Sequence, residues 1–165
     1  MIEKENIKDG VKSIARFSDC EKYRYTLTRT WDSSKGKIVF IGLNPSTADE
    51  MKNDPTVTRM INFAKSWGYG TISVCNIFAY RATFPEDLKK QQDPVGPETD
   101  KWLKSEINSA DKVVAAWGNH GKFNNRSSEI RKIISNNEIY SFGNTNLLEP
   151  KHVLYLKSSS QIIKI

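Results

Sequence analysis

The chain has 165 residues, of which 38% are hydrophobic, and it carries a formal net charge of +6. This length and composition exclude an intrinsically disordered chain and suit one folded domain, which we expect to span residues 1–165. No apolar run approaches the roughly 20 residues of a membrane-spanning helix, and the charged first residues resemble no secretory signal, so we expect a cytoplasmic protein without a membrane partner.

The first half of the chain contains two predicted strands and one predicted helix. Residues 23–31, YRYTLTRTW, alternate apolar or aromatic residues with polar ones, which indicates a half-buried strand at a sheet edge. Residues 38–43 are continuously apolar, as in a central strand that is buried on both faces. Asp54 and Pro55 then form a helix start, with Asp54 as N-cap, and apolar residues at helical spacing continue this helix until Gly68.

The second half repeats the alternation of apolar strands and amphipathic helices. Residues 72–78 and 113–117 are predicted buried strands, and a short strand follows at 139–142. One helix is predicted to begin at Pro97 and another to surround residues 130–134. This order favours an α/β protein, which we predict to be a three-layer α/β/α sandwich with a mostly parallel four-stranded central sheet and an N-terminal edge strand.

Polar side chains follow the predicted strands at the points where the strands end. Ligands of parallel sheets bind outside the carboxyl ends of the strands, which brings together loops 42–49, 76–82 and 118–121 and the segment around His152. These loops contain no Cys/His metal set, no G-x-S-x-G elbow and no phosphate loop. The two cysteines of the chain form neither a disulfide framework nor a zinc pattern. We therefore expect no metal and no organic cofactor.

Several stretches in these loops resemble known families. GLNPS at residues 42–46 is similar to the first motif of the uracil-DNA glycosylase superfamily, and SVCNIFAYRATFPEDL at 73–88 is similar to its second-strand segment. VVAAWGNHGKF at 113–123 resembles its strand that ends in a glycine-containing loop, and KHVLYLKSSS at 151–160 occupies the place of its last motif. The stretches GLNPSTAD, DPVGPE and AAWG also resemble a bacterial family, domain of unknown function 1643, over nearly the whole chain.

The superfamily resemblance implies an N-glycosidic hydrolase that acts on a nucleobase in DNA or in a modified nucleotide. Breaking this bond produces an oxocarbenium-like sugar and an anionic base, so the site has to place a water molecule and donate hydrogen bonds to the base. Asn44 would position the water, Asn76 would recognise the base edge, and His152 would donate to the oxygen that gains charge. The other residues expected to bind substrate are Pro45, Ser46, Asp49, Phe78, Tyr80, Arg81, Gly118 and His120.

Each of these assignments has a structural alternative. Asn44 also fits a turn before Pro45, and Asn76 also fits a residue that satisfies loop backbone groups. Asp49 also fits a helix cap, and Arg81 also fits a surface ion pair. The net positive charge suits DNA or RNA as well as it suits an ordinary basic protein, because Lys and Arg are scattered along the chain.

Two departures from the superfamily widen the range of functions. Ser46 stands where the mismatch-specific branch has Gly, and Val153 and Leu154 follow His152 in place of Pro and Ser, so no intercalating loop is recognisable. The alternatives to a hydrolase are a non-catalytic nucleotide or nucleic-acid binding protein of the same fold and an enzyme on a different small substrate. The base, the form of the ligand (DNA, nucleotide or nucleoside) and the oligomeric state stay open.

Overall fold

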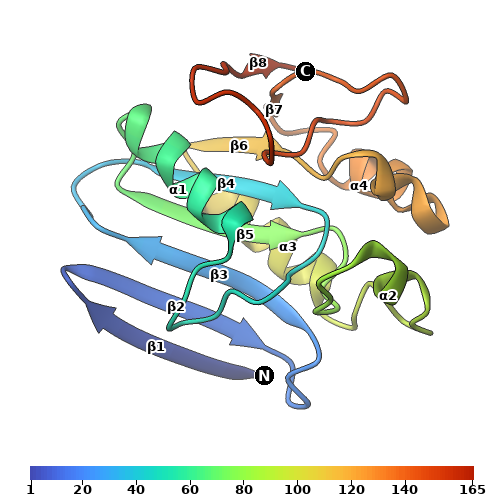
Figure 1. The fold of residues 1–165 in the computed structure, drawn as a ribbon, viewed down its shortest axis with the longest axis horizontal. Coiled ribbons are helices and arrows are strands. Elements are labelled where there is room, and N and C mark those ends of the chain that lie inside the picture. The colour runs from blue at the N-terminus through green and yellow to red at the C-terminus, as the bar shows by residue number, and fades with distance from the viewer.

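A single mixed sheet of eight strands extends across the computed structural model, which describes residues 1–165 (Figure 1). The strands lie in the order β1-β2-β3-β5-β4-β6-β7-β8. Their bounds are β1 Ile2–Lys8, β2 Val11–Phe17, β3 Arg24–Thr30, β4 Lys37–Gly42, β5 Thr71–Asn76, β6 Lys112–Ala115, β7 Tyr140–Ser141 and β8 Ile163–Lys164. The helices are α1 Pro55–Ser66, α2 Pro85–Lys89, α3 Thr99–Ser109 and α4 Arg126–Ile133, with a 3₁₀ segment at Asn119–Asn125.

The predicted fold class, a mostly parallel four-stranded sheet with one edge strand, is wrong. Only β4 with β5, β4 with β6, and β6 with β7 pair in parallel. The pairs β1–β2, β2–β3, β3–β5 and β7–β8 are antiparallel. Strand β3, which was expected at an edge, lies between β2 and β5. The alternating pattern of a strand is the same for either direction of its neighbour, so the pattern did not decide the pairing.

The β1–β2 hairpin accounts for much of this difference, and the sequence reasoning missed it. Strand β1, IEKENIK, is polar, and most of its residues are exposed or half-exposed, so it lacks the apolar run of a buried strand. The turn does carry a recognisable mark. Asp9 and Gly10 have φ values of 53° and 78°, and they connect the paired residues Lys8 and Val11. An Asp-Gly pair with two positive φ angles is typical of a two-residue hairpin turn.

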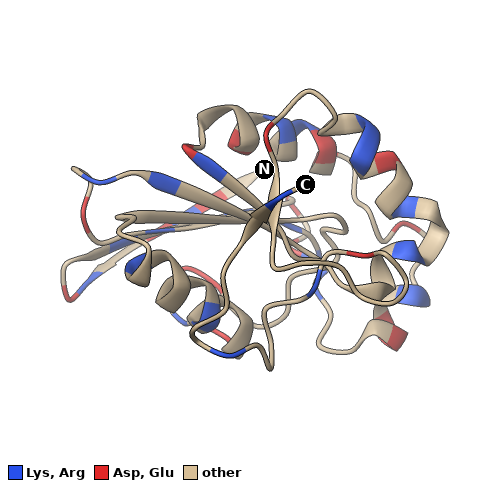
Figure 2. Ribbon diagram, turned by 90° about the horizontal axis from the view of Figure 1, so that it is seen from above, with Lys and Arg blue, Asp and Glu red and all other residues tan.

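The sheet separates two apolar cores, and Figure 2 shows helices on both of its sides. Alternate residues of β4 point to opposite faces, as the period of a strand requires. Phe40 belongs to the core that contains Met60 and Phe63 of α1. Ile41 belongs to the core that contains Leu103 of α3 and residues of α4. The central strands are therefore buried on both faces, and ligands have access only to their ends.

Helix α1 begins as the sequence predicted. Asp54 is its N-cap in an extended conformation, the Asp54 carboxylate accepts a hydrogen bond from the Val57 N–H at 2.9 Å, and Pro55 is the first helical residue. Trp67, the C-cap residue, packs on the ring of Phe63 with centroids 5.3 Å apart. None of the helices is both long and apolar enough to cross a membrane.

Candidate functional site

A cavity of about 900 Å³ lies at the carboxyl ends of the parallel strands. The ends of β4 and β5, the loop after β6, the segment around His152 and the first turn of α1 all contribute to its wall. Apolar side chains such as Leu43 and Trp117 form part of the lining, and polar groups project among them. Cavities of this size and composition are typical of small-molecule sites.

Some of the residues that the sequence predicted for the site line this cavity, and others do not. Those that line it are Asn44, Pro45, Ser46, Asn76, Gly118, His120 and His152. Four others point elsewhere. Phe78 is fully buried in the α3-side core, and Tyr80 packs edge-on against Tyr23 with centroids 5.8 Å apart. The Asp49 carboxylate accepts hydrogen bonds from the Met51 and Lys52 N–H groups, and Arg81 donates to the Glu21 carbonyl and covers the ring of Phe17.

Asn44 has a fixed orientation because its amide nitrogen faces backbone carbonyls. Nδ2 donates to the Ala82 oxygen at 2.8 Å and to the Pro45 oxygen at 3.0 Å. Only the nitrogen of a carboxamide can donate to these acceptors, so Oδ1 has to point the other way. Asn44 therefore joins the loops after β4 and β5, and it keeps one acceptor oxygen free at the cavity.

Asn76, the last residue of β5, is 5% exposed, and its Nδ2 is buried without any hydrogen-bond partner. A buried amide left in this state costs about 1–3 kcal/mol, so natural structures rarely keep one without a reason. Its Oδ1 lies where a side chain at Gly42 would be, since an added Cβ there would be 2.7 Å away. Gly42 thus makes room for an amide group that lines the cavity.

The His152 ring is held by a backbone hydrogen bond to one of its nitrogens. Its Nδ1 accepts from the Leu154 N–H at 3.2 Å, which leaves the proton of the neutral ring on Nε2. Burial lowers the pKa of His152, and the Asp54 carboxylate only partly opposes this shift. The loop after β6 lies close to the His152 segment at Gly118. Gly118 has a φ of 72°, and its N–H donates to the Pro150 carbonyl at 2.8 Å. His120, in contrast, is exposed, and its Nδ1 lies 3.1 Å from the Lys89 amine.

The sequence reasoning overlooked Arg24, which also lines the cavity. It is 2% exposed, its Nη1 donates to the Ala48 carbonyl at 2.8 Å, and its Nε is buried without a partner. Because β3 is antiparallel to β5, the first residue of β3 lies beside the end of β5, and the Arg24 N–H donates to the Ala79 carbonyl at 2.9 Å. The one signal for this residue in the sequence is that an arginine stands among aromatic and apolar residues at the beginning of a predicted strand.

The cavity has one carboxylate, and that group is occupied. Asp54 Oδ1 accepts from the Val57 N–H and Oδ2 accepts from the Ala48 N–H at 3.3 Å. Arg24 and Lys151 are the formally positive side chains of the lining. The structure contains no group of three or more His, Cys, Asp or Glu side chains placed to hold a metal ion.

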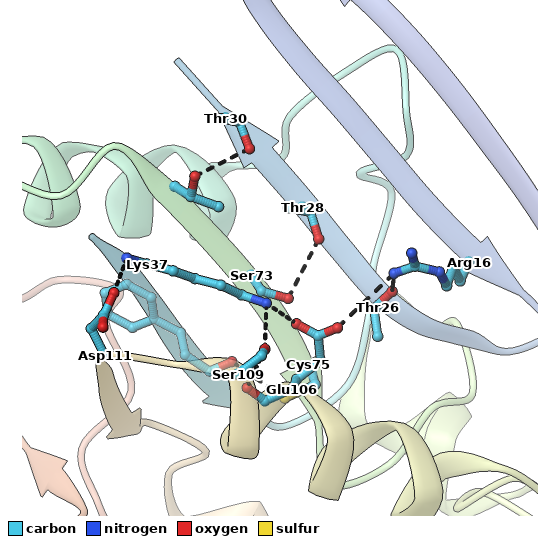
Figure 3. Close-up of polar contacts among 12 residues, drawn as sticks. Arg16, Thr26, Thr28, Thr30, Lys37, Ser73, Cys75, Glu106, Ser109 and Asp111 are labelled. Carbon is cyan, nitrogen blue, oxygen red and sulfur yellow. Dashed lines mark hydrogen bonds and ion pairs between the residues drawn. The ribbon is translucent and has the colours of Figure 1, made fainter. Parts of the chain in front are cut away.

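A second polar cluster lies away from the cavity, beneath α3 (Figure 3). The Glu106 side chain is 8% exposed and is 2.8 Å from the Lys37 amine and 4.0 Å from Arg16 Nη1. Lys37 also donates to the Ser109 hydroxyl at 2.7 Å. These contacts tie α3 to β2 and to the amino end of β4. Every charge in this cluster has a partner, so we assign it a structural role.

Comparison with known proteins supports a family assignment. The family described as protein of unknown function (DUF1643) matches residues 24–154. The chain belongs to this family. The match covers β3 to the His152 segment and so includes nearly the whole cavity wall, whereas β1 and β2 precede it. A search among curated proteins found no match.

Proposed function

We propose that this DUF1643 protein hydrolyses the N-glycosidic bond of a nucleobase, in DNA or in a modified nucleotide, and that it does so in the cytoplasm. The observation that carries the proposal is the Asn76 amide, whose buried N–H has no partner in the chain and lines a cavity wide enough for a nucleotide. The remote resemblance to uracil-DNA glycosylases supports the same chemistry.

The groups around the cavity suit the steps of such a reaction. The Asn76 N–H would donate to a carbonyl oxygen of the base, and the neutral His152 would donate from Nε2 to an oxygen that gains charge as the base leaves. The free Oδ1 of Asn44 would accept a hydrogen bond from the attacking water. The water oxygen bonds to C1′ of the sugar, and the electron pair of the C1′–N bond leaves with the base. The water releases its proton to solvent, and the base takes one up from solvent.

A second function, nucleotide or nucleic-acid binding without hydrolysis, is favoured by a specific observation. The only carboxylate of the cavity, Asp54, is held by two backbone N–H groups, so no free general base stands beside the ligand. A neutral asparagine activates water less than a carboxylate does. A binding protein would need the Asn76 donor but would not need Asn44 to hold water.

The test is base release from single- and double-stranded oligonucleotides and from free nucleotides that carry uracil, hypoxanthine, xanthine or alkylated bases. We expect release by the native chain, loss of release in Asn44→Ala and Asn76→Ala, and unchanged release in Thr47→Ala. Thr47 is exposed in the same loop and does not line the cavity, which makes it the matched control. Binding of the same compounds without release by the folded native chain would replace the hydrolase with the binding function.

A further inference from the structure

We infer that Arg24 and the first turn of α1 form a phosphate subsite in the cavity, so that the ligand is a nucleoside monophosphate and not duplex DNA. The nucleoside part of this inference rests on the proposed function. The phosphate part rests on Arg24 and α1 alone.

Arg24 differs from the other buried arginines of the chain. Arg126, also 2% exposed, donates to the Ile77 carbonyl at 2.7 Å and forms ion pairs with Asp100 and Glu129. Arg29, 4% exposed, donates to Asn53 and to the carbonyls of a loop. Arg24 has one neutral acceptor, no ion pair and an unpartnered Nε. Burial lowers the pKa of Arg24, and the Asp54 carboxylate in the same cavity wall opposes this shift but forms no ion pair with Arg24. A buried charge is stable only when it is paired and hydrogen-bonded, so Arg24 still lacks a directly paired anion.

The cavity wall contains a further hydrogen-bond donor, at the N-terminus of helix α1. Helix α1 has 12 residues, and its first residues line the cavity together with Arg24. The N-terminal end of a helix carries a partial positive charge and free N–H groups. Pro55 has no N–H, the Val57 N–H donates to the Asp54 carboxylate, and the Thr58 N–H donates to the Asp54 carbonyl. The Thr56 N–H, which donates to no backbone acceptor, is the one left for a ligand. A guanidinium and a helix N-terminus that face one cavity are groups that bind phosphate.

Burial and charge distribution favour a phosphate monoester over a duplex. An arginine that is 2% exposed can contact only a phosphate that enters the cavity, and the phosphates of a duplex stay at the protein surface. Figure 2 shows segments of Lys and Arg interspersed with segments of Asp and Glu along the ribbon. A terminal phosphate carries a charge of about −1.5 to −2 at neutral pH and offers three acceptor oxygens. Desolvation lowers the pKa of Arg24 to about 10, and a bound dianion would oppose that effect.

The test is calorimetric titration of the full chain with a nucleoside monophosphate, the matching nucleoside, inorganic phosphate and a duplex oligonucleotide. We expect the monophosphate to bind roughly 10- to 100-fold more tightly than the nucleoside, the range for charge-assisted hydrogen bonds. Arg24→Met should abolish this preference, and Arg24→Lys should retain part of it. Arg81→Met is the matched control, because Arg81 was predicted to bind substrate yet lies outside the cavity.

The outcomes separate this inference from the proposed hydrolase. Equal binding of monophosphate and nucleoside, or a preference that survives in a folded Arg24→Met variant, overturns the subsite even if Asn44-dependent base release is observed. Arg24-dependent binding of monophosphate and inorganic phosphate without base release from any compound keeps the subsite and overturns the hydrolase. Circular dichroism and a thermal melt of each variant establish that it is folded.

Discussion

Asn44 and Asn76 stand at the ends of neighbouring strands, and the structure predicts opposite effects on stability when each is replaced by alanine. The Asn76 side chain makes no hydrogen bond to the chain, and its Nδ2 is buried. Asn76→Ala removes a desolvation penalty of about 1–3 kcal/mol and loses only the packing of three heavy atoms. We therefore expect the free energy of unfolding to stay within about 1 kcal/mol of the native value or to rise.

Asn44→Ala loses hydrogen bonds to the Ala82 and Pro45 carbonyls. At about 0.5–1.5 kcal/mol for each bond, the free energy of unfolding should fall by about 1–3 kcal/mol. Urea denaturation followed by tryptophan fluorescence measures both values under the same conditions. Since both variants remove the same chemical group, the difference between them isolates the hydrogen bonds.

Ligand binding is the second readout for this pair. If Asn76 recognises a ligand, Asn76→Ala weakens binding while stability is kept, which is the usual trade between function and stability at a site. A loss of more than about 1 kcal/mol of stability in Asn76→Ala would show that its amide is satisfied within the folded protein, and the reasoning that assigns it to a ligand would fail.

Two further predictions concern residues that do not depend on the ligand. Glu106→Gln should lower the free energy of unfolding by about 3 kcal/mol or more, because it leaves the part-buried Lys37 amine without its 2.8 Å ion pair. Glu98→Gln, which removes the exposed ion pair with Lys101, is the control and should change the free energy of unfolding by less than about 1 kcal/mol in the same urea titration. The lowered pKa of His152 means that the unfolded chain binds a proton more readily than the folded chain near its ordinary value of 6.5. The stability contributed by neutral His152 is therefore present above pH 6.5 and is lost as the pH falls below it. Melting temperatures measured from pH 8 down to pH 5 should fall less in His152→Gln than in the native chain. An equal fall in melting temperature in the two proteins would indicate that groups other than His152 cause the loss of stability at low pH.

The sequence by itself determined the local elements around the site. The apolar runs of β4, β5 and β6 and the Asp54–Pro55 start of α1 all occur where their patterns predicted them. Such patterns depend on residues that are close in the chain, because strand period and helix capping are local effects. The same patterns placed Asn44 and Asn76 at or just after strand ends, which meet the segment around His152 at one cavity.

Tertiary structure alone decided the strand directions and, through them, the composition of the cavity. An alternating strand has the same pattern whether its neighbour runs parallel or antiparallel to it, and only the hydrogen-bonded pairing distinguishes the two. The antiparallel insertion of β3 beside β5 carries Arg24 to the ligand end of the sheet. Side-chain direction after β5 likewise sends Phe78 into a core and Arg81 toward Phe17, although both follow Asn76 closely in the sequence. The position of Arg24 at the cavity therefore depends on the pairing of β3 with β5, two strands far apart in the sequence, and no local pattern encodes that pairing.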